Sequence, residues 1–89
     1  MSDTPPALLE FPCDFPIKVM GRTSPEFQAL MIELVRRHAP DLDENLVRVQ
    51  ESRGGRYLAV TLNIRATSKA QLDAIYRELS RHEQVVMAL

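Results

Sequence analysis

Apolar and mostly polar side chains alternate along residues 57–66, which run Tyr57-Leu58-Ala59-Val60-Thr61-Leu62-Asn63-Ile64-Arg65-Ala66. Successive side chains of a β-strand point to opposite faces of its sheet, so a period of two predicts a strand here. One set of side chains faces a core: Leu58, Val60, Leu62 and Ile64. The other set, from Tyr57 to Arg65, faces away from it. The segment therefore predicts a sheet with one buried face and one open face.

A glycine-rich turn connects this strand to the one before it. Arg53-Gly54-Gly55-Arg56 predicts a hairpin, because glycine adopts the positive φ angles that tight turns require. Upstream of the turn, residues 46–50 alternate again and predict the partner strand. An acidic loop, residues 41–45, precedes that strand.

Two further strands and two helices are predicted on either side of this hairpin. Residues 15–20 alternate around Ile17 and Val19 and predict a strand that ends at Gly21. A capping box at residues 23–26 then predicts a helix that stops before Pro40. A second capping box, Ser68 to Gln71, predicts a second helix, and residues 84–89 predict a last strand. The apolar stripes of the two helices are Phe27, Leu30, Met31, Leu34 and Val35, and Leu72, Ile75, Tyr76 and Leu79.

The order of elements is β-α-β-β-α-β. Right-handed crossovers put both helices on one face of a four-stranded antiparallel sheet with strand order 4-1-3-2, the ferredoxin-like α+β fold. We expect a single domain over residues 14–89. Residues 1–13 are proline-rich and predict a partly ordered tail whose Leu9 and Phe11 pack on the domain.

Composition narrows the classes of function. The 89 residues carry a net charge of −1. The protein therefore lacks the broad positive field that non-specific binding to nucleic acid or anionic membranes requires. Cys13 is the single cysteine and has no disulfide partner in the chain. Residues 1–6 have no signal-peptide pattern, and no apolar segment approaches the length of a membrane span. These features predict a cytoplasmic protein that does not bind a membrane.

No pattern of residues predicts catalysis, a metal site or a cofactor. His38 and His82 follow basic residues at helix ends, where cations complement the helix dipole, and neither has a second ligand at helical spacing. The serines lie outside any glycine-rich elbow, and the spacing of Ser80 and His82 points the two apart. We therefore expect a protein that is not an enzyme.

Several short blocks carry a resemblance to a known family: Leu8-Leu9-Glu10-Phe11-Pro12, Phe15 to Gly21, Arg37-His38-Ala39-Pro40 and Gly55-Arg56-Tyr57. With them the chain resembles the YbeD-like family of small bacterial proteins of unknown function, from about Leu8 to Leu89. The resemblance implies a ferredoxin-like fold similar to ACT-type regulatory domains, and it implies no catalytic residue.

Similarity to ACT domains implies one candidate site, because those domains bind small effectors around the loop after the first strand. In this chain the loop contains Gly21, Arg22 and Thr23. Backbone amides at a helix N-terminus beside an arginine favour a carboxylate or phosphate. The plainer interpretation is that Gly21 relieves crowding in a turn and Thr23 caps the helix.

The open sheet face is the second candidate site. Six of its residues are candidates for contact with a partner: Lys18, Met20, Tyr57, Thr61, Asn63 and Arg65. RNA-recognition sheets stack bases on aromatic rings, but Tyr57 is the one ring on this face and Ala59 stands where a second would be, so nucleic acid is disfavoured. We expect a regulatory or binding domain that acts through a protein partner or a small anionic effector, with a homodimer as one form of pairing. An RNA-associated module is the alternative.

Overall fold

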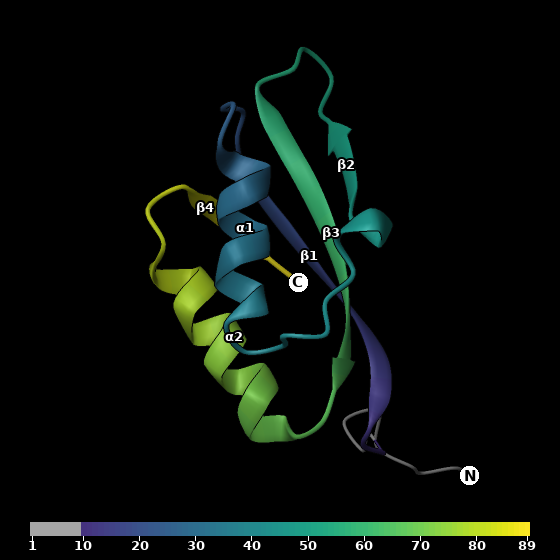
Figure 1. Ribbon diagram of the computed structural model, residues 1–89. Coiled ribbons are helices and arrows are strands. Elements are labelled where there is room, and N and C mark those ends of the chain that lie inside the picture. Colours follow the sequence, from purple (N-terminus) through teal and green to yellow (C-terminus); the bar gives the residue numbers. More distant parts are fainter. Residues whose placement is uncertain (1–9) are drawn as a thin grey trace, which may run out of the picture.

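The computed structural model describes residues 10–89 of the chain. Its strands are β1 (Cys13–Arg22), β2 (Arg48–Glu51), β3 (Tyr57–Ala66) and β4 (Val85–Ala88), and its α-helices are α1 (Phe27–Arg36) and α2 (Lys69–Arg81), as Figure 1 shows. A short 3-10 helix, η1 (Glu44–Leu46), precedes β2. This order of strands and helices confirms the β-α-β-β-α-β prediction.

The four strands form one antiparallel sheet in the order β2-β3-β1-β4. Read from the other edge this is 4-1-3-2, so the predicted topology is confirmed. The central strands β1 and β3 pair over all ten residues, from Cys13 opposite Ala66 to Arg22 opposite Tyr57. The edge strands β2 and β4 have four residues each.

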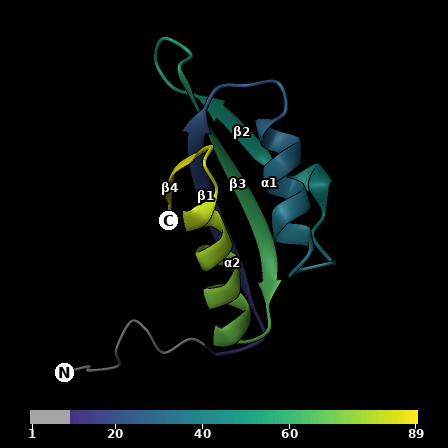
Figure 2. The ribbon, with the colours of Figure 1, turned by 90° about the vertical axis from the view of Figure 1, so that its left-hand side faces the viewer.

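The core lies between the sheet and the helices, which both cover the same face of the sheet (Figures 1 and 2). Ile17 and Val19 of β1 are fully buried, as are Val60 and Leu62 of β3. From the helices the core receives residues at three- and four-residue spacing, among them Phe27, Met31, Val35, Leu72, Ile75 and Leu79. Both predicted apolar stripes thus supply the core, and the outer face of the sheet has no layer over it among the described residues.

Strand β1 is longer at both ends than the alternation over residues 15–20 predicts. Gly21 does not end the strand, because β3 continues opposite it and supplies hydrogen-bonding partners as far as Arg22. At the other end, Cys13 pairs with Ala66 and therefore belongs to the sheet rather than to the predicted tail. Phe11 packs against the core from that tail, whereas Leu9 and the rest of residues 1–9 lie outside the described residues.

Helix α1 begins later than its predicted capping box, and Thr23 does not cap it. The residue before the helix is Glu26, whose side chain makes no cap hydrogen bond. The Thr23 hydroxyl instead donates to the Gly55 carbonyl oxygen at 2.6 Å. Helix α2 does begin as predicted, since the Ser68 hydroxyl accepts from the Gln71 amide at 3.0 Å.

Candidate functional site

The loop after β1 lies against the β2–β3 hairpin. Besides the hydroxyl contact, the Thr23 amide donates to the Arg56 carbonyl at 2.9 Å, so the amide and the hydroxyl of Thr23 are both used within the protein. Gly21 is buried, and a Cβ there would overlap the Phe27 ring and the Gln84 carbonyl oxygen. Of the three loop candidates, Gly21 is buried, whereas Arg22 and Thr23 are exposed.

Arg22 shares a hollow with a second arginine. Arg22, Thr23, Gly55, Arg56 and Tyr57 line this corner hollow, of about 600 Å³. Both arginines are exposed, and neither has a carboxylate partner among the described residues. Arg56 follows a turn whose Gly54 and Gly55 have positive φ, and these two glycines return the chain so that Arg56 lines the same hollow as Arg22. The hollow is thus cationic.

The outer sheet face carries all six residues predicted for it. Lys18 lies opposite Thr61, and Arg48 of β2 lies opposite Thr61 on its other side, so these three form one row across the sheet. The face also includes Asp14, Arg22 and Gln50 by the same alternation, and Met87 of β4 opposite Met20.

This outer face has a charge opposite to that of the protein. Its strands present four cationic side chains, Lys18, Arg22, Arg48 and Arg65, against the one carboxylate of Asp14. Arg65 pairs with Asp14 at 3.1 Å, while the other three cations have no carboxylate partner among the described residues. The whole chain has a net charge of −1, so charge is strongly segregated onto this side.

Five of the six predicted residues line one of two hollows on the face, and Thr61 lines neither of them. Lys18, Met20 and Tyr57 line a shallow hollow of about 190 Å³ together with residues of β2. Asn63 and Arg65 lie toward the far end, in a hollow of about 460 Å³ that also receives Asp14, Asp41 and Asp43. Both hollows mix charges, because Glu51 lines the first and Arg48 lines the second.

β4 and the residue after it carry an apolar patch that was not predicted from the sequence. Val86 is 56% exposed, Met87 48% and Leu89 67%, and these three make up most of the large apolar side chains that residues 10–89 expose. Their exposure follows from a bulge in the pairing between β4 and β1, which turns Val86 out of the regular alternation. The sequence pattern of residues 84–89 predicts a strand but does not predict this bulge.

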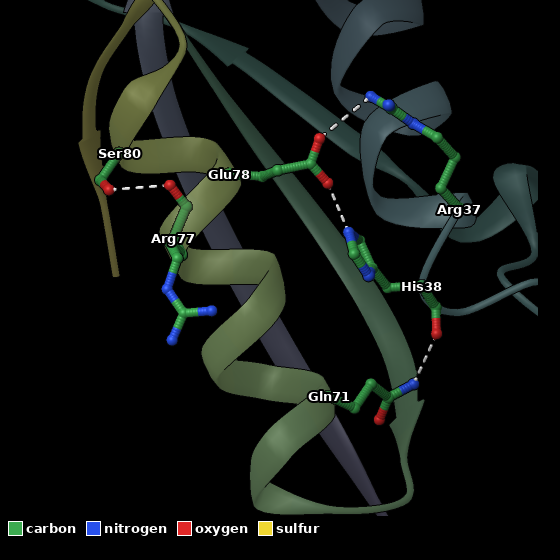
Figure 3. A network of polar contacts seen from close by, with 6 residues as sticks. All are labelled: Arg37, His38, Gln71, Arg77, Glu78 and Ser80. Carbon is green, nitrogen blue, oxygen red and sulfur yellow. Dashed lines mark hydrogen bonds and ion pairs between the residues drawn. The ribbon is translucent and has the colours of Figure 1, made fainter.

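A polar network on the helix side ties the end of α1 to α2 (Figure 3). The His38 ring and Arg37 both bind the Glu78 carboxylate, Arg37 at 3.4 Å, and the Gln71 amide group donates to the His38 carbonyl at 2.9 Å. The hydrogen bond from His38 and the charge of Arg37 hold the pKa of Glu78 below its ordinary value, although partial burial acts in the opposite direction.

This network contains no side-chain hydroxyl or thiol. Figure 3 shows Ser80 on another side of α2, where its hydroxyl donates to the Arg77 carbonyl. Among residues 10–89 no polar or charged side chain is buried, and no three side chains of the types that ligate metals converge. No helix in the described part of the chain has the length and apolar character to cross a membrane. The network is a surface clamp between helices.

Comparisons with known proteins agree on one family. A family model described as "Protein of unknown function (DUF493)" matches residues 6–89. A UPF0250 protein of Chromobacterium violaceum is 51% identical over 89 residues, covering all of both chains. One of Nitrosomonas europaea is 44% identical over 86 residues, covering 97% of this chain and 99% of its own. The solution structure of protein HP0495 from H. pylori superposes with a TM-score of 0.76 at 16% identity, over 100% of this chain and 93% of that one, which shows the shared fold.

Proposed function

The chain belongs to the DUF493 family of proteins of unknown function, and on that premise we propose that it is a non-catalytic binding module whose outer sheet face binds an acidic segment of another protein. Membership confirms the resemblance to the YbeD-like family. The observation that carries the proposal is the uncovered outer face, on which Lys18, Arg22 and Arg48 lack carboxylate partners within the described residues.

Electrostatics favours an acidic partner over a second copy bound face to face. Two copies paired through this face would place cations against cations. Like charges that face each other across an interface cost several kcal/mol of binding free energy. Acidic side chains would instead find three unpaired cations beside the apolar side chains of Met20 and Met87. Charge then steers the encounter, while the apolar contacts add affinity.

Capture from a bacterial lysate tests the proposal. The tagged protein is compared with the double variant Lys18→Glu/Arg48→Glu and with a control, Arg77→Glu/Arg81→Glu, which makes the same change in net charge on exposed positions of α2. We expect acidic proteins that the wild type and the control retain and the outer-face variant loses. Capture that is unchanged in Lys18→Glu/Arg48→Glu contradicts the proposal, as does a bound fraction that ribonuclease removes, which would favour the RNA alternative.

A small anionic effector is the second candidate, and the corner hollow favours it. Arg22 and Arg56 line one hollow without carboxylate partners in the described residues, so a carboxylate or phosphate there would meet two guanidinium groups. Thermal-shift measurements with inorganic phosphate and with succinate test this, using Arg22→Ala/Arg56→Ala as the variant. Stabilisation of the wild type alone supports the effector, and equal shifts in both proteins contradict it.

A further inference from the structure

We infer that the acidic segment joins the sheet as a fifth strand along the outer edge of β4, an inference that rests on the proposed function. A sheet edge presents unpaired amide and carbonyl groups that a strand of another chain can bind. The described residues contain three such free stretches: the outer edge of β2, the outer edge of β4, and the half of β1 that β4 does not reach.

The free half of β1 is blocked by Pro16. Lys18 exchanges two hydrogen bonds with Leu89, at 3.1 and 2.8 Å, so the backbone groups of Lys18 point toward the β4 side. Backbone groups alternate in direction along an antiparallel strand, so those of Pro16 point the same way. Proline has no amide proton, and an added strand would find no donor at that position.

The outer edge of β2 is protected by charge. Two of its four residues, Arg48 and Glu51, are charged, and all four are exposed. Charged side chains are the usual means by which edge strands avoid pairing with other chains. Residues 85–89 have no charged side chain and no proline, so the edge of β4 has neither of these two protections.

The geometry of β4 places the docking point at Ala88. Met87 lies opposite Met20, and Leu89 bonds to Lys18, so by alternation the amide and carbonyl of Ala88 point outward. A strand added there would exchange two hydrogen bonds with Ala88 and lie beside the exposed side chains of Met87 and Leu89. The bulge at Val86 limits regular pairing to this end of β4, so the complex is short and weak.

The same geometry specifies the chemistry of the segment. Strands lie about 4.8 Å apart, so the added strand is roughly 10 Å from β1. A glutamate on its outer face would then meet the extended side chain of Lys18, which lies next to Leu89 in the sheet. Arg48 of β2 lies two strands beyond β1, so it takes no part in this contact. The occupant is therefore an extended segment in which acidic residues alternate with apolar ones.

Synthetic peptides provide a direct test, read by fluorescence anisotropy. The probe is a labelled peptide of about ten residues, the length of an extended recognition segment, in which glutamate and valine alternate. One control has the same composition with the valines and glutamates in separate blocks. Two further peptides are alternating but N-methylated at every second residue, in one phase or the other. We expect the alternating peptide to bind and the block peptide not to bind. Of the two N-methylated peptides, only the one whose docked edge is unmodified should bind.

Protein variants test the same inference from the other side. Ala88→Pro removes the outward amide of β4, and Val49→Pro is its matched control, because alternation from the Ser52 amide bond to Tyr57 makes the Val49 amide point outward from β2. We expect Ala88→Pro to weaken peptide binding about tenfold and Val49→Pro to leave it unchanged. Slowed hydrogen exchange of the Ala88 amide in the wild-type complex gives an independent readout that needs no variant.

The outcomes separate this inference from the proposed function. Strand addition is overturned if the peptide with separate blocks of valine and glutamate binds as well as the alternating one. It is also overturned if neither N-methylation in either phase nor Ala88→Pro weakens peptide binding, while Lys18→Glu/Arg48→Glu still abolishes lysate capture. The proposed function fails if that double variant captures normally. A dimer in sedimentation that Ala88→Pro dissolves would assign the edge to a second copy and overturn the peptide partner.

Discussion

Lys18 of β1 and Arg48 of β2 lie in one row across the outer sheet face, on either side of Thr61 of β3. Neither cation has a carboxylate partner among the described residues. A sheet selected for stability alone would place an acidic residue between them. The row thus leaves favourable electrostatic energy unused in the isolated protein, which is the property expected of a surface that receives charge from a partner.

Thr61→Glu should stabilise the protein, because its carboxylate would stand between two cations. Each cross-strand pair contributes about 0.2–1 kcal/mol to the free energy of unfolding. The gain is measured by urea denaturation at low salt, and it should shrink near 1 M salt, where screening acts over roughly 3 Å. Thr61→Gln is the control without charge. Equal stabilities of the two variants at low salt would mean that the row is already neutralised.

Gly21→Ala should destabilise the protein, because the added methyl group would overlap the Phe27 ring and the Gln84 carbonyl oxygen. Overpacking of this kind costs about 1–3 kcal/mol. Thermal or urea unfolding measures the loss. Gly21→Ala should cost less stability in a Phe27→Leu background than in the wild type, because the overlapping ring atoms are gone. Some cost should remain, because the Gln84 carbonyl oxygen stays in place. A variant as stable as the wild type would contradict the close packing of β1 on α1.

Thr23→Val should lower stability modestly and loosen the corner hollow. The hydroxyl donates to the Gly55 carbonyl at 2.6 Å in an exposed position, and a hydrogen bond of this type contributes about 0.5–1.5 kcal/mol. Valine keeps the shape and removes the donor. Thr23→Ser keeps the hydroxyl, so in urea unfolding it should lie closer to the wild type. The reverse order would show that the methyl group matters more than the hydrogen bond.

Glu78→Gln should cost stability at neutral pH and little in acid. The folded-state pKa of Glu78 is lowered, chiefly by the His38 hydrogen bond, so its carboxylate stabilises the fold above its ordinary pKa of 4.5 and loses that contribution as the pH falls below it. The side chains of the pair are 26% and 35% exposed, which keeps the difference under about 1 kcal/mol. Urea unfolding of both proteins across this pH range measures it. A difference that persists well below pH 4.5 would assign the effect to packing.

Local periodicity was sufficient to predict the sheet and the two helices. The alternation in residues 57–66 predicts β3 with its correct bounds, and Gly54 and Gly55 predict the hairpin, because both features depend on neighbours in the chain. The same alternation assigns Lys18 and Thr61 to the outer face. Both of these residues lie there in the structure.

The missed features all depend on residues distant in sequence. Thr23 resembles a helix cap until the fold places Gly55 next to it, 32 positions away. His38 is explained at the sequence level by a helix end, yet its partner Glu78 is 40 positions away. The bulge in β4 is equally a property of pairing with β1, so the exposed patch of Val86 and its neighbours could not be predicted from the order of residues.

Pro16 also bears on how the protein behaves at high concentration. A sheet that accepts one strand at its edge is a template for polymer growth, and long unprotected edges seed fibrils. Here the accepting stretch is confined to the end of β4, and the adjoining stretch of β1 lacks the amide that would let pairing spread along it. A docked strand therefore has no ladder along which to lengthen, and we expect crowded solutions to hold small finite complexes instead of filaments.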